Sequence, residues 1–266
     1  MPGEILVGTS GYSYTDWKGP FYPSNLSQSS FLEYYSGYFS TVEINYTFYR
    51  MPEPDSFIRM QERVPRGFSF SVKAFGEMTH RPDASRIEDL SKRFIEAVEP
   101  LKKSDRLGCV VFQFPYSFHY NTENRNYLSS MLDMFEGLPL AVEFRGEDWM
   151  KDQVSDDLTK RSIAFVCVDE PPLKGLIKPN EIVTSRIGYV RFHGRNIKNW
   201  WSGDSASRYD YLYSEEELEE WIPRIAGIAS KTDKVFVYMN NHWQGKAVEN
   251  AVMLKNLLKK NGFKTR

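Results

Sequence analysis

Eight short apolar runs recur along the chain, and segments with helical periodicity separate most of them. The runs span residues 5–8, 41–45, 68–73, 108–114, 140–145, 163–169, 188–193 and 234–240. The clearest helical segments span residues 31–39, 56–64, 87–103, 124–135, 215–229 and 247–260. Strands that alternate with helices pair in parallel through right-handed crossovers. Eight such units in 266 residues predict a single α/β barrel of the TIM type, (β/α)8, with an open doubly wound sheet as the alternative.

Nothing in the chain marks a boundary between domains. No linker, charge run or low-complexity tract divides it, so we expect one barrel domain over residues 1–266. One unit of the barrel is expected to be irregular, because Pro171, Pro172 and Pro179 lie between the sixth and seventh strands and leave little room for a regular helix.

The connection after the seventh strand, between His193 and Glu215, is long and aromatic. Its rings are those of Trp200, Trp201, Tyr209, Tyr211 and Tyr213. Loops that follow strands rim the active face of a barrel, so this loop is a candidate lid or stacking platform. The alternative is a long loop that is packed down by its own rings.

Charge and cysteine content limit the partners and the location of the protein. Lys and Arg number 34 against 35 Asp and Glu, a net charge of −1 that argues against a dedicated nucleic-acid-binding protein but leaves room for a local basic groove. Cys109 and Cys167 lie in apolar runs, which favours buried free thiols and a reducing compartment. Without a membrane-length apolar stretch or a signal-peptide pattern, we expect a cytoplasmic protein outside the membrane. The oligomeric state is left open.

Three runs end in pairs of polar residues two positions apart, which share one face of a strand because the side-chain period is two. The pairs are Glu43 with Asn45, Glu143 with Arg145, and Arg191 with His193. The same alternation predicts an inward-facing set at the C-terminal mouth of the barrel. Its members are Ser10, Glu43, Asn45, Lys73, Gln113, Glu143, Arg145, Asp169, Arg191, His193, Tyr238 and Asn240.

Glu43, Glu143 and His193 are the candidate catalytic residues. Two carboxylates that face each other across the mouth suit general acid/base catalysis, as in glycoside hydrolysis. His193 can position a substrate or transfer a proton. Together with Asp169 and His242, these side chains could also hold a divalent metal such as magnesium or manganese. Because no spacing typical of a zinc site is present, no residue is assigned as a metal ligand and the cofactor is left unknown.

Lys73, Arg145 and Arg191 are candidates for an anion clamp, because arginine suits planar, bidentate recognition of phosphate or carboxylate. With the remaining polar members of the inward set they would bind an anionic substrate. The alternative is a set of salt bridges that only satisfy one another, since buried charge costs several kcal/mol unless it is paired.

The glycine-rich segment 8–12 follows the first strand and contains Ser10 and Tyr12. Glycines can bring backbone amides close to a ligand, so both residues enter the candidate set as substrate-binding groups. A tight turn is the alternative. Familiar fingerprints are absent: no Gly-x-Gly-x-x-Gly follows a strand, and neither a phosphate loop nor a Gly-x-Ser-x-Gly elbow occurs.

Motifs at seven strand ends resemble the YecE-like family, which is catalogued as a domain of unknown function. They are Val7-Gly8-Thr9-Ser10-Gly11-Tyr12, Val42-Glu43-Ile44-Asn45-Tyr46, Phe70-Ser71-Val72-Lys73, Gln113-Phe114-Pro115, Val142-Glu143-Phe144-Arg145, Tyr189-Val190-Arg191-Phe192-His193 and Asn240-Asn241. The match covers essentially the whole chain and implies a (β/α) barrel without settling the function. Members of the family are similar in outline to sugar isomerases and apurinic-site endonucleases, which implies a phosphate or nucleic-acid ligand. The four histidines of this chain are too few for a copy of their multi-zinc sites.

Three functions follow from these observations. The favoured one is an enzyme, of hydrolase or isomerase type, that acts on a phosphate- or carboxylate-bearing small molecule at the mouth of the barrel. The second is a nucleic-acid-binding or nucleic-acid-processing protein that uses the same cations, with Trp200, Trp201 and Tyr209 stacking on bases. The third is a ligand-binding module without catalysis.

Overall fold

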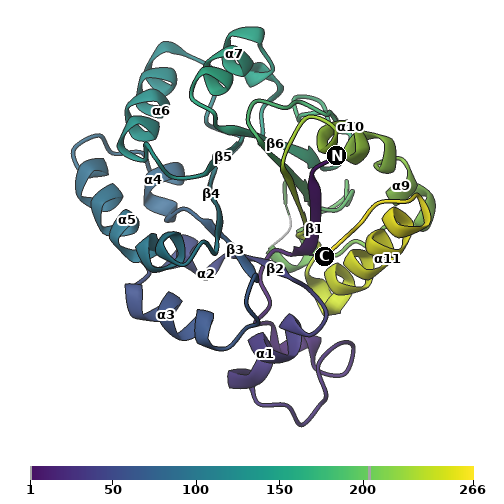
Figure 1. Cartoon of the computed structure of the whole chain (residues 1–266). Helices are drawn as coiled ribbons and strands as arrows, with labels where there is room; N and C mark the ends of the chain where they lie inside the picture. The colour runs from purple at the N-terminus through teal and green to yellow at the C-terminus, as the bar shows by residue number, and fades with distance from the viewer. Residues whose placement is uncertain (1, 203–204) are drawn as a thin grey trace.

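Eight parallel strands form one barrel-shaped sheet at the centre of the protein. The computed structural model describes residues 2–202 and 205–266 (Figure 1). The strands are β1 (Glu4–Thr9), β2 (Thr41–Ile44), β3 (Ser69–Lys73), β4 (Leu107–Gln113), β5 (Leu140–Glu143), β6 (Ala164–Asp169), β7 (Ile187–Phe192) and β8 (Lys234–Met239). Their spatial order is β1-β8-β7-β6-β5-β4-β3-β2, with every pairing parallel. The predicted (β/α)8 barrel is confirmed, because a doubly wound sheet would need this order to reverse.

The barrel closes between β1 and β2 through an isolated bridge and one tyrosine. The bridge joins Ser10 to Glu43. Next to it the Tyr35 hydroxyl lies between the strands, where it accepts from the Thr9 N–H at 2.9 Å and donates to the Thr41 carbonyl at 3.1 Å. A side-chain hydroxyl thus satisfies backbone groups that a regular ladder would pair directly.

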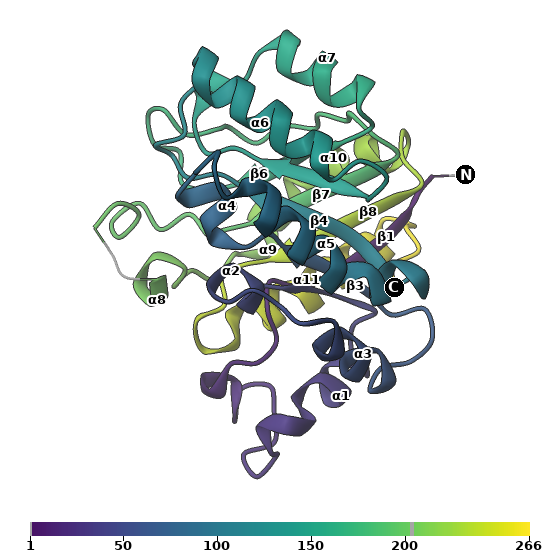
Figure 2. The same ribbon diagram turned by 90° about the vertical axis from the view of Figure 1, so that its left-hand side faces the viewer.

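Most helices surround the barrel on its outer side, whereas the short helix α8 lies beyond one end of it (Figures 1 and 2). They are α1 (Phe31–Ser36), α2 (Tyr46–Tyr49), α3 (Pro54–Glu62), α4 (Gly76–His80), α5 (Ile87–Lys103), α6 (Thr122–Met134), α7 (Asp152–Lys160), α8 (Ser205–Arg208), α9 (Glu215–Glu219), α10 (Ile222–Ala229) and α11 (Lys246–Lys260). Their buried apolar residues recur every three or four positions, as in the α5 series Ile87, Leu90, Phe94, Val98 and Leu101. The segment predicted as one helix over 215–229 is divided into α9 and α10, because Pro223 lacks an N–H and fits only the first turn of a helix.

The connection between β6 and β7 contains no helix, as its three prolines predict. Residues 170–186, which the structure describes throughout, form turns and extended segments. Thr184 pins this stretch to the sheet, since its Oγ1 accepts from the Phe165 N–H at 2.8 Å and donates to the Ile163 carbonyl at 2.6 Å. The irregular unit therefore completes the hydrogen bonding of β6 at its start, before its pairing with β7 begins at Val166.

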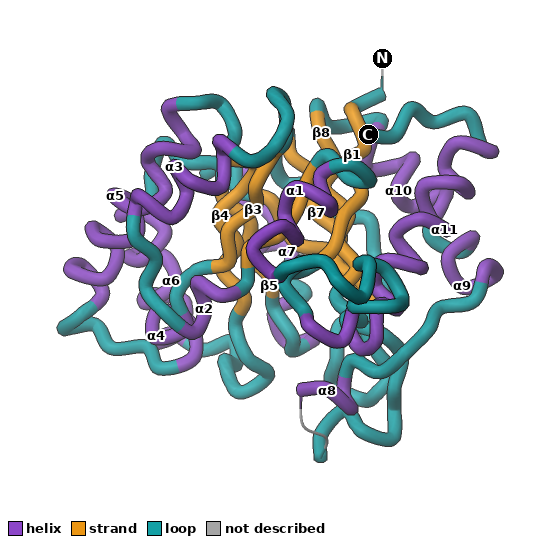
Figure 3. Tube along the Cα trace, turned by 90° about the horizontal axis from the view of Figure 1, so that it is seen from below, coloured by secondary structure: helices purple, strands orange, loops and turns teal. Residues whose placement is uncertain are grey.

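Aromatic rings fill the middle of the barrel, below the charged residues at the strand ends. The Tyr238 ring lies 5.4 Å from Tyr189 and 6.1 Å from Phe236, measured between centroids. Its hydroxyl bonds with Thr41 Oγ1 at 2.6 Å and donates to Ser71 Oγ at 3.0 Å. The strands lead from this layer toward α8 and the longest loops, whereas both chain ends lie at the opposite end of the barrel (Figure 3). The end with α8 is the mouth that could admit a ligand.

Two further expectations concern the cysteines and the membrane. Cys109 and Cys167 are buried and free, as predicted. Burial raises the pKa of the Cys167 thiol to about 12, so this side chain is protonated at neutral pH. Among the residues that the structure describes, no helix is long and apolar enough to cross a membrane.

Candidate active site

A buried arginine joins two carboxylates across the interior of the barrel. Arg191 of β7 donates from Nη2 to Glu43 Oε1 at 2.7 Å and from Nη1 to Glu143 Oε2 at 2.5 Å. Glu43 belongs to β2 and Glu143 to β5, so one guanidinium connects three strands. The Ser10 and Tyr189 hydroxyls also donate to Glu43, at 2.8 and 2.7 Å. Both oxygens of Glu43 are therefore occupied by protein donors.

A second arginine extends this network toward the mouth. Arg145 follows β5, and its Nε lies 2.9 Å from Glu143 Oε1. Its Nη1 donates to Glu170 Oε2 at 2.8 Å, while Glu170 Oε1 accepts from the Ile177 N–H at 3.2 Å. The Trp200 ring covers the guanidinium, with 5.5 Å between the guanidinium carbon and the ring centroid. Arg145 thus links the buried network to the aromatic loop.

His193 is a neutral member of the network. Asn240 Nδ2 lies 2.9 Å from His193 Nδ1, and His193 Nε2 lies 3.2 Å from Glu143 Oε1. Because an amide nitrogen can only donate, Nδ1 is the acceptor and Nε2 carries the proton, although Nε2 makes no hydrogen bond to a described residue. Burial and the neighbouring charge of Arg145 lower the pKa of His193 to about 3, against the opposing effect of Glu143. His193 therefore stays uncharged through the physiological pH range.

The two carboxylates that contact Arg145 have different acidities. Burial alone would raise the pKa of Glu143, but the guanidiniums of Arg191 and Arg145 hold it well below its usual range. Burial raises the pKa of Glu170 to about 7, against the lowering effect of Arg145 and with a further contribution from Glu143. At neutral pH Glu143 is ionised, whereas Glu170 is near the midpoint of its titration.

Lys73 ends β3 and carries an amine with unusual surroundings. Its Nζ donates to Gln113 Oε1 at 2.8 Å and lies 4.3 Å from the centroid of the Phe48 ring. No carboxylate forms an ion pair with it among residues 2–202 and 205–266. Burial, followed by the positive charge of Arg191, lowers its pKa to about 7. Near neutral pH this amine exists in charged and uncharged forms.

A pocket of about 360 Å³ opens at the mouth above these residues. Cations, an amide and aromatic rings line it, together with His80, Pro115 and Leu176. The cations are Lys73, Arg145 and Arg208, the amide is Gln113, and the rings are Phe48, Tyr49, Tyr116, Trp200, Trp201 and Tyr209. The aromatic loop after β7 therefore contributes directly to the wall of the pocket.

The structure brings most of the predicted site residues together in two groups. Those that line the pocket are Lys73, Gln113 and Arg145. Those that form the buried network are Ser10, Glu43, Glu143, Arg191, His193 and Asn240. Tyr238 faces inward but lies one layer deeper, where it contacts Thr41 and Ser71. The candidate general acid/base pair is thus beneath the pocket rather than in its wall.

Tyr12 and Asn45 lie apart from both groups. Tyr12 lines a separate hollow with Tyr46, Arg59 and Arg63. Asn45 precedes α2, and its Oδ1 is buried without a hydrogen-bond partner among the described residues. Neither side chain lines the pocket at the mouth.

The expectation that Asp169 faces the interior is wrong. Its carboxylate lies on the outer side of β6, where it accepts from the Tyr213 hydroxyl and Trp221 Nε1, both at 2.7 Å, and from Arg195 Nη2 at 2.8 Å. The inward group at this strand is the next residue, Glu170. The run 164–169 is nearly all apolar and shows no alternation of polar and apolar residues. The sequence therefore does not indicate which of its residues face the barrel interior.

The pocket also contains residues that sequence reasoning did not assign to the site. His80 and Phe48 belong to short helices that follow β3 and β2, and Arg208 ends α8. Arg208 Nε is buried without a hydrogen-bond partner among the described residues. Only the position of these residues after strands could have indicated a place at the mouth, and that criterion applies to many others.

The side chains considered for a metal do not form a ligand set. Within the described residues, no group of three or more His, Cys, Asp or Glu side chains is placed to hold a metal ion. Arginines occupy Glu43 and Glu143, and Asp169 faces away from both. His242 stacks on Tyr14, with 4.7 Å between the ring centroids. No residue is therefore assigned as a metal ligand.

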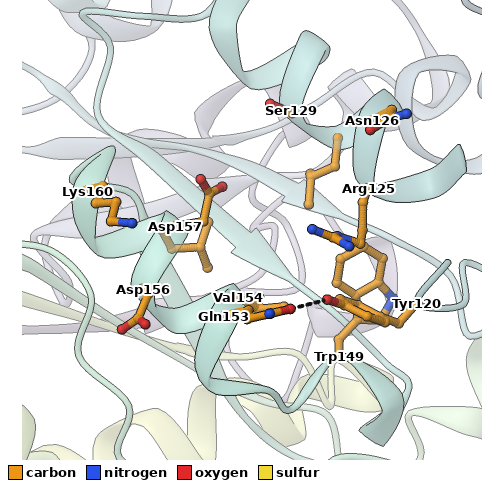
Figure 4. A pocket seen from close by; sticks show the side chains of 12 residues that line it. Tyr120, Arg125, Asn126, Ser129, Trp149, Gln153, Val154, Asp156, Asp157 and Lys160 are labelled. Carbon is orange, nitrogen blue, oxygen red and sulfur yellow. Dashed lines mark hydrogen bonds between the residues drawn. The ribbon is translucent and has the colours of Figure 1, made fainter. Parts of the chain in front are cut away.

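A second hollow, of about 370 Å³, lies on the outside of the barrel between α6 and α7 (Figure 4). Arg125 and Lys160 line it together with Asp156 and Asp157, so its charges are mixed. None of the predicted site residues reaches this hollow. It has neither the buried network nor the excess of cations seen at the strand ends.

The parallel closed sheet and the polar mouth at its strand ends define a (β/α)8-barrel protein. Residues 6–265 match the family described as "Protein of unknown function DUF72", and the chain belongs to this family. The resemblance to the YecE-like family is thereby confirmed.

Relatives and solved structures agree with this assignment. UPF0759 protein YunF of Bacillus subtilis is 30% identical over 275 residues, 96% of this chain and 94% of the relative. UPF0759 protein YecE of Escherichia coli K12 is 31% identical over 114 residues, 43% of this chain and 39% of the relative. A DUF72 family crystal structure from Thermotoga maritima is 37% identical with a TM-score of 0.89, covering 96% of this chain and 99% of the other. Another, from Enterococcus faecalis, is 25% identical with a TM-score of 0.86, covering 96% and 95% of the two chains.

Proposed function

We propose that this protein is an enzyme that acts on a small anionic substrate at the C-terminal mouth of its barrel. The observation that supports this is the charge of the pocket wall. Lys73, Arg145 and Arg208 line the pocket, and no carboxylate does so among the described residues. A concave site lined by one sign of charge raises the local concentration of ligands of the opposite sign.

The three cations differ in how they are paired. Arg145 contacts Glu143 and Glu170, whose charges offset its own. Lys73 and Arg208 form no ion pair in the part of the chain that the structure describes, and Arg208 Nε lacks a hydrogen-bond partner there. Partly buried cations without counter-charges are unfavourable, so a bound phosphate or carboxylate would satisfy them.

The aromatic walls indicate that the substrate also has a less polar portion. Trp200 and Tyr209 lie on one side, with 6.5 Å between their centroids, and Tyr116 packs on Trp201 at 4.9 Å. A pocket of about 360 Å³ suits a metabolite-sized molecule rather than a folded protein. The charged end of the substrate would meet the cations, and its remainder would lie against the rings.

Proton transfer in this pocket falls most naturally to Lys73. Its pKa of about 7 matches the value that a general acid or base needs at neutral pH. Glu43 and Glu143 are occupied by Arg191 and Arg145, so we propose that they hold the two arginines in place. His193, whose Nε2 lies 3.2 Å from Glu143 Oε1 without forming a hydrogen bond, then packs against this carboxylate rather than exchanging a proton itself.

Calorimetric titration with inorganic phosphate tests the anion site. Wild-type protein is expected to bind one phosphate, and Arg208→Gln should weaken binding about ten- to a hundredfold, because it removes a charged donor. Arg125→Gln, in the hollow between α6 and α7, removes an arginine outside the pocket and serves as the matched control. Equal affinity in all three proteins, or no binding to the wild type at low salt, would contradict the proposal.

Turnover separates the enzyme from a binding module without catalysis. A screen of phosphate esters and small carboxylates would identify a substrate, and Lys73→Met should then abolish turnover. If phosphate binds but Lys73→Met leaves a measured turnover intact, the catalytic role of Lys73 is wrong.

Nucleic-acid binding is a second candidate, supported by exposed rings at the mouth. The Tyr49 side chain is 79% exposed and that of Trp201 54%, and both line the same pocket as Arg208. Rings and cations at one groove are the combination that single-stranded nucleic acids bind. Affinity for an oligonucleotide should then fall steeply with salt and fall again in Trp201→Ala. Absence of binding at low salt would eliminate this candidate.

A further inference from the structure

We propose that Lys73 forms an imine with a small substrate that carries both a carbonyl group and an anionic group. This inference rests on the proposed function, because the same pocket must first hold the anion. It adds a covalent step and names the class of substrate, an oxo acid or a phosphorylated aldehyde or ketone.

The position of Lys73 is that of a nucleophile rather than of a structural cation. It is the only lysine among the described residues that line the pocket. Its Nζ has one polar partner, Gln113 Oε1 at 2.8 Å, and an aromatic face below it, the Phe48 ring at 4.3 Å. A lysine that served only to balance protein charge would be paired with a carboxylate, as Arg145 and Arg191 are.

The surroundings of Lys73 favour the neutral amine. Burial and the charges of Arg191 and Arg145 lower its pKa to about 7, although Glu143 and Glu43 act in the opposite direction. Because only the unprotonated amine has a lone pair, a lysine beside other cations in a desolvated site is an activated nucleophile. Arg145, one of the two arginines that hold the substrate anion, thus also prepares the amine.

The chemistry needs no reactant besides the substrate. The amine nitrogen forms a bond to the carbonyl carbon, the C=O π bond breaks, and the oxygen takes up a proton while nitrogen loses one, giving a carbinolamine. Protonation of that hydroxyl and loss of water then leave a C=N double bond with a positive charge on nitrogen. Overall, one amine, one carbonyl and one proton give one iminium and one water, with no change of oxidation state.

The residues around Nζ suit this iminium. Gln113 Oε1 accepts the hydrogen bond of the amine and can accept that of the iminium N–H in the same place. The face of Phe48 favours a cation above it. The substrate anion, held by Arg145 and Arg208, offsets the added positive charge. An iminium withdraws electrons from the neighbouring carbon, so the reaction would be proton removal or carbon–carbon bond cleavage next to the carbonyl.

Reductive trapping on the wild-type protein tests the inference. Full-length protein is incubated at pH 7 with sodium cyanoborohydride together with one carbonyl probe, pyruvate in one reaction and glyceraldehyde 3-phosphate in another. Labelled lysines are then located by peptide mass spectrometry. Lys255 is a stringent internal control, since burial also lowers its pKa and its Nζ lies 5.3 Å from the Phe39 ring, but it is outside the pocket. With at least one probe, Lys73 should be labelled about tenfold faster than Lys255 or more, and excess inorganic phosphate should suppress only the Lys73 adduct.

Two results would overturn the inference, and they differ in what they say of the proposed function. If phosphate binds but Lys73 is labelled no faster than Lys255 by either probe, the imine is wrong and the anion site stands. If phosphate does not bind and Lys73 is not labelled, both fail. Lys73→Arg, which retains the charge without a nucleophilic amine, should lose the pocket adduct and keep phosphate binding.

Discussion

Arg191 donates to Glu143 at 2.5 Å, and this contact joins β7 to β5 through the interior of the barrel. The same guanidinium reaches Glu43 on β2 at 2.7 Å. With all three side chains almost fully buried, the arrangement is a structural strut as well as the floor of the candidate active site. Its stability and its chemistry can be tested separately.

Removal of the strut is expected to be severely destabilising. Arg191→Met leaves two buried carboxylates without their main counter-charge, which should lower the free energy of unfolding by about 3–5 kcal/mol. Urea denaturation followed by tryptophan fluorescence measures the loss. Arg186→Met removes an arginine from the exposed pair with Asp233 and should leave the denaturation midpoint unchanged. Equal midpoints for the two variants would show that the buried pairs contribute little.

Asp169 anchors the aromatic loop from outside the barrel. Its carboxylate holds the Tyr213 hydroxyl, Trp221 Nε1 and Arg195, so Asp169→Ala strands buried donors and should cost about 3 kcal/mol or more. Amide hydrogen exchange of the segment 207–213 should accelerate at the same time. Asp233→Ala, which removes only an exposed carboxylate, should leave both measurements at the wild-type values. Unchanged exchange in Asp169→Ala would mean that other contacts hold the loop.

The sequence predicts which residues face the site only in strands where charged and apolar residues alternate. In β2, β5 and β7, charged residues alternate with apolar ones, and Glu43, Glu143 and Arg191 do converge as that parity requires. The run of β6 is apolar on both faces, because helices or loops cover one side and the barrel interior the other. Without alternation the inward choice between Asp169 and Glu170 was undetermined.

The pocket wall was less accessible to sequence reasoning than the network beneath it. Its floor is formed by residues at the strand ends, and the side-chain period of two determines which of these side chains face the interior. Its rim is formed by short helices and loops, which carry residues such as His80 and Arg208. The direction of these side chains depends on tertiary packing. The aromatic residues of the loop after β7 indicated a place at the mouth, but only the fold shows that Trp200 covers Arg145.

His193 is expected to remain neutral in one tautomer. Its pKa is lowered to about 3, and Asn240 donates to Nδ1, so Nε2 should carry the proton throughout pH 5–8. Nitrogen-15 chemical shifts of the imidazole, assigned by comparison with His193→Gln, measure this directly. A shift of both nitrogens toward imidazolium values above pH 5 would contradict the burial argument.

Glu170→Gln should change the pH dependence of stability. The pKa of Glu170 is raised from 4.5 to about 7 in the folded protein, so stability that depends on its protonated form is full at low pH and is lost as pH rises through 7. Glutamine cannot ionise. The free energy of unfolding of Glu170→Gln relative to wild type should therefore increase by about 2–3 kcal/mol between pH 5 and 8. Urea denaturation of both proteins at each pH measures this difference, and a constant difference would refute the raised pKa.

The reactivity of Lys73 should follow a titration near neutral pH. Burial lowers the pKa of its amine, Arg191 and Arg145 lower it further, and Glu143 and Glu43 raise it. Competitive acetylation with acetic anhydride, read by peptide mass spectrometry, should give a midpoint at about pH 7 for the Lys73 peptide.

Arg145→Gln should move that midpoint upward, because it removes a neighbouring positive charge and leaves Glu143 and Glu170 less compensated. The exposed Arg186→Gln is the matched control and should leave the midpoint at the wild-type value. A wild-type midpoint near 10, the ordinary range for lysine, would remove the basis for proton transfer by Lys73 at neutral pH. A low midpoint that Arg145→Gln did not raise would instead assign the shift to burial and Arg191 rather than to Arg145.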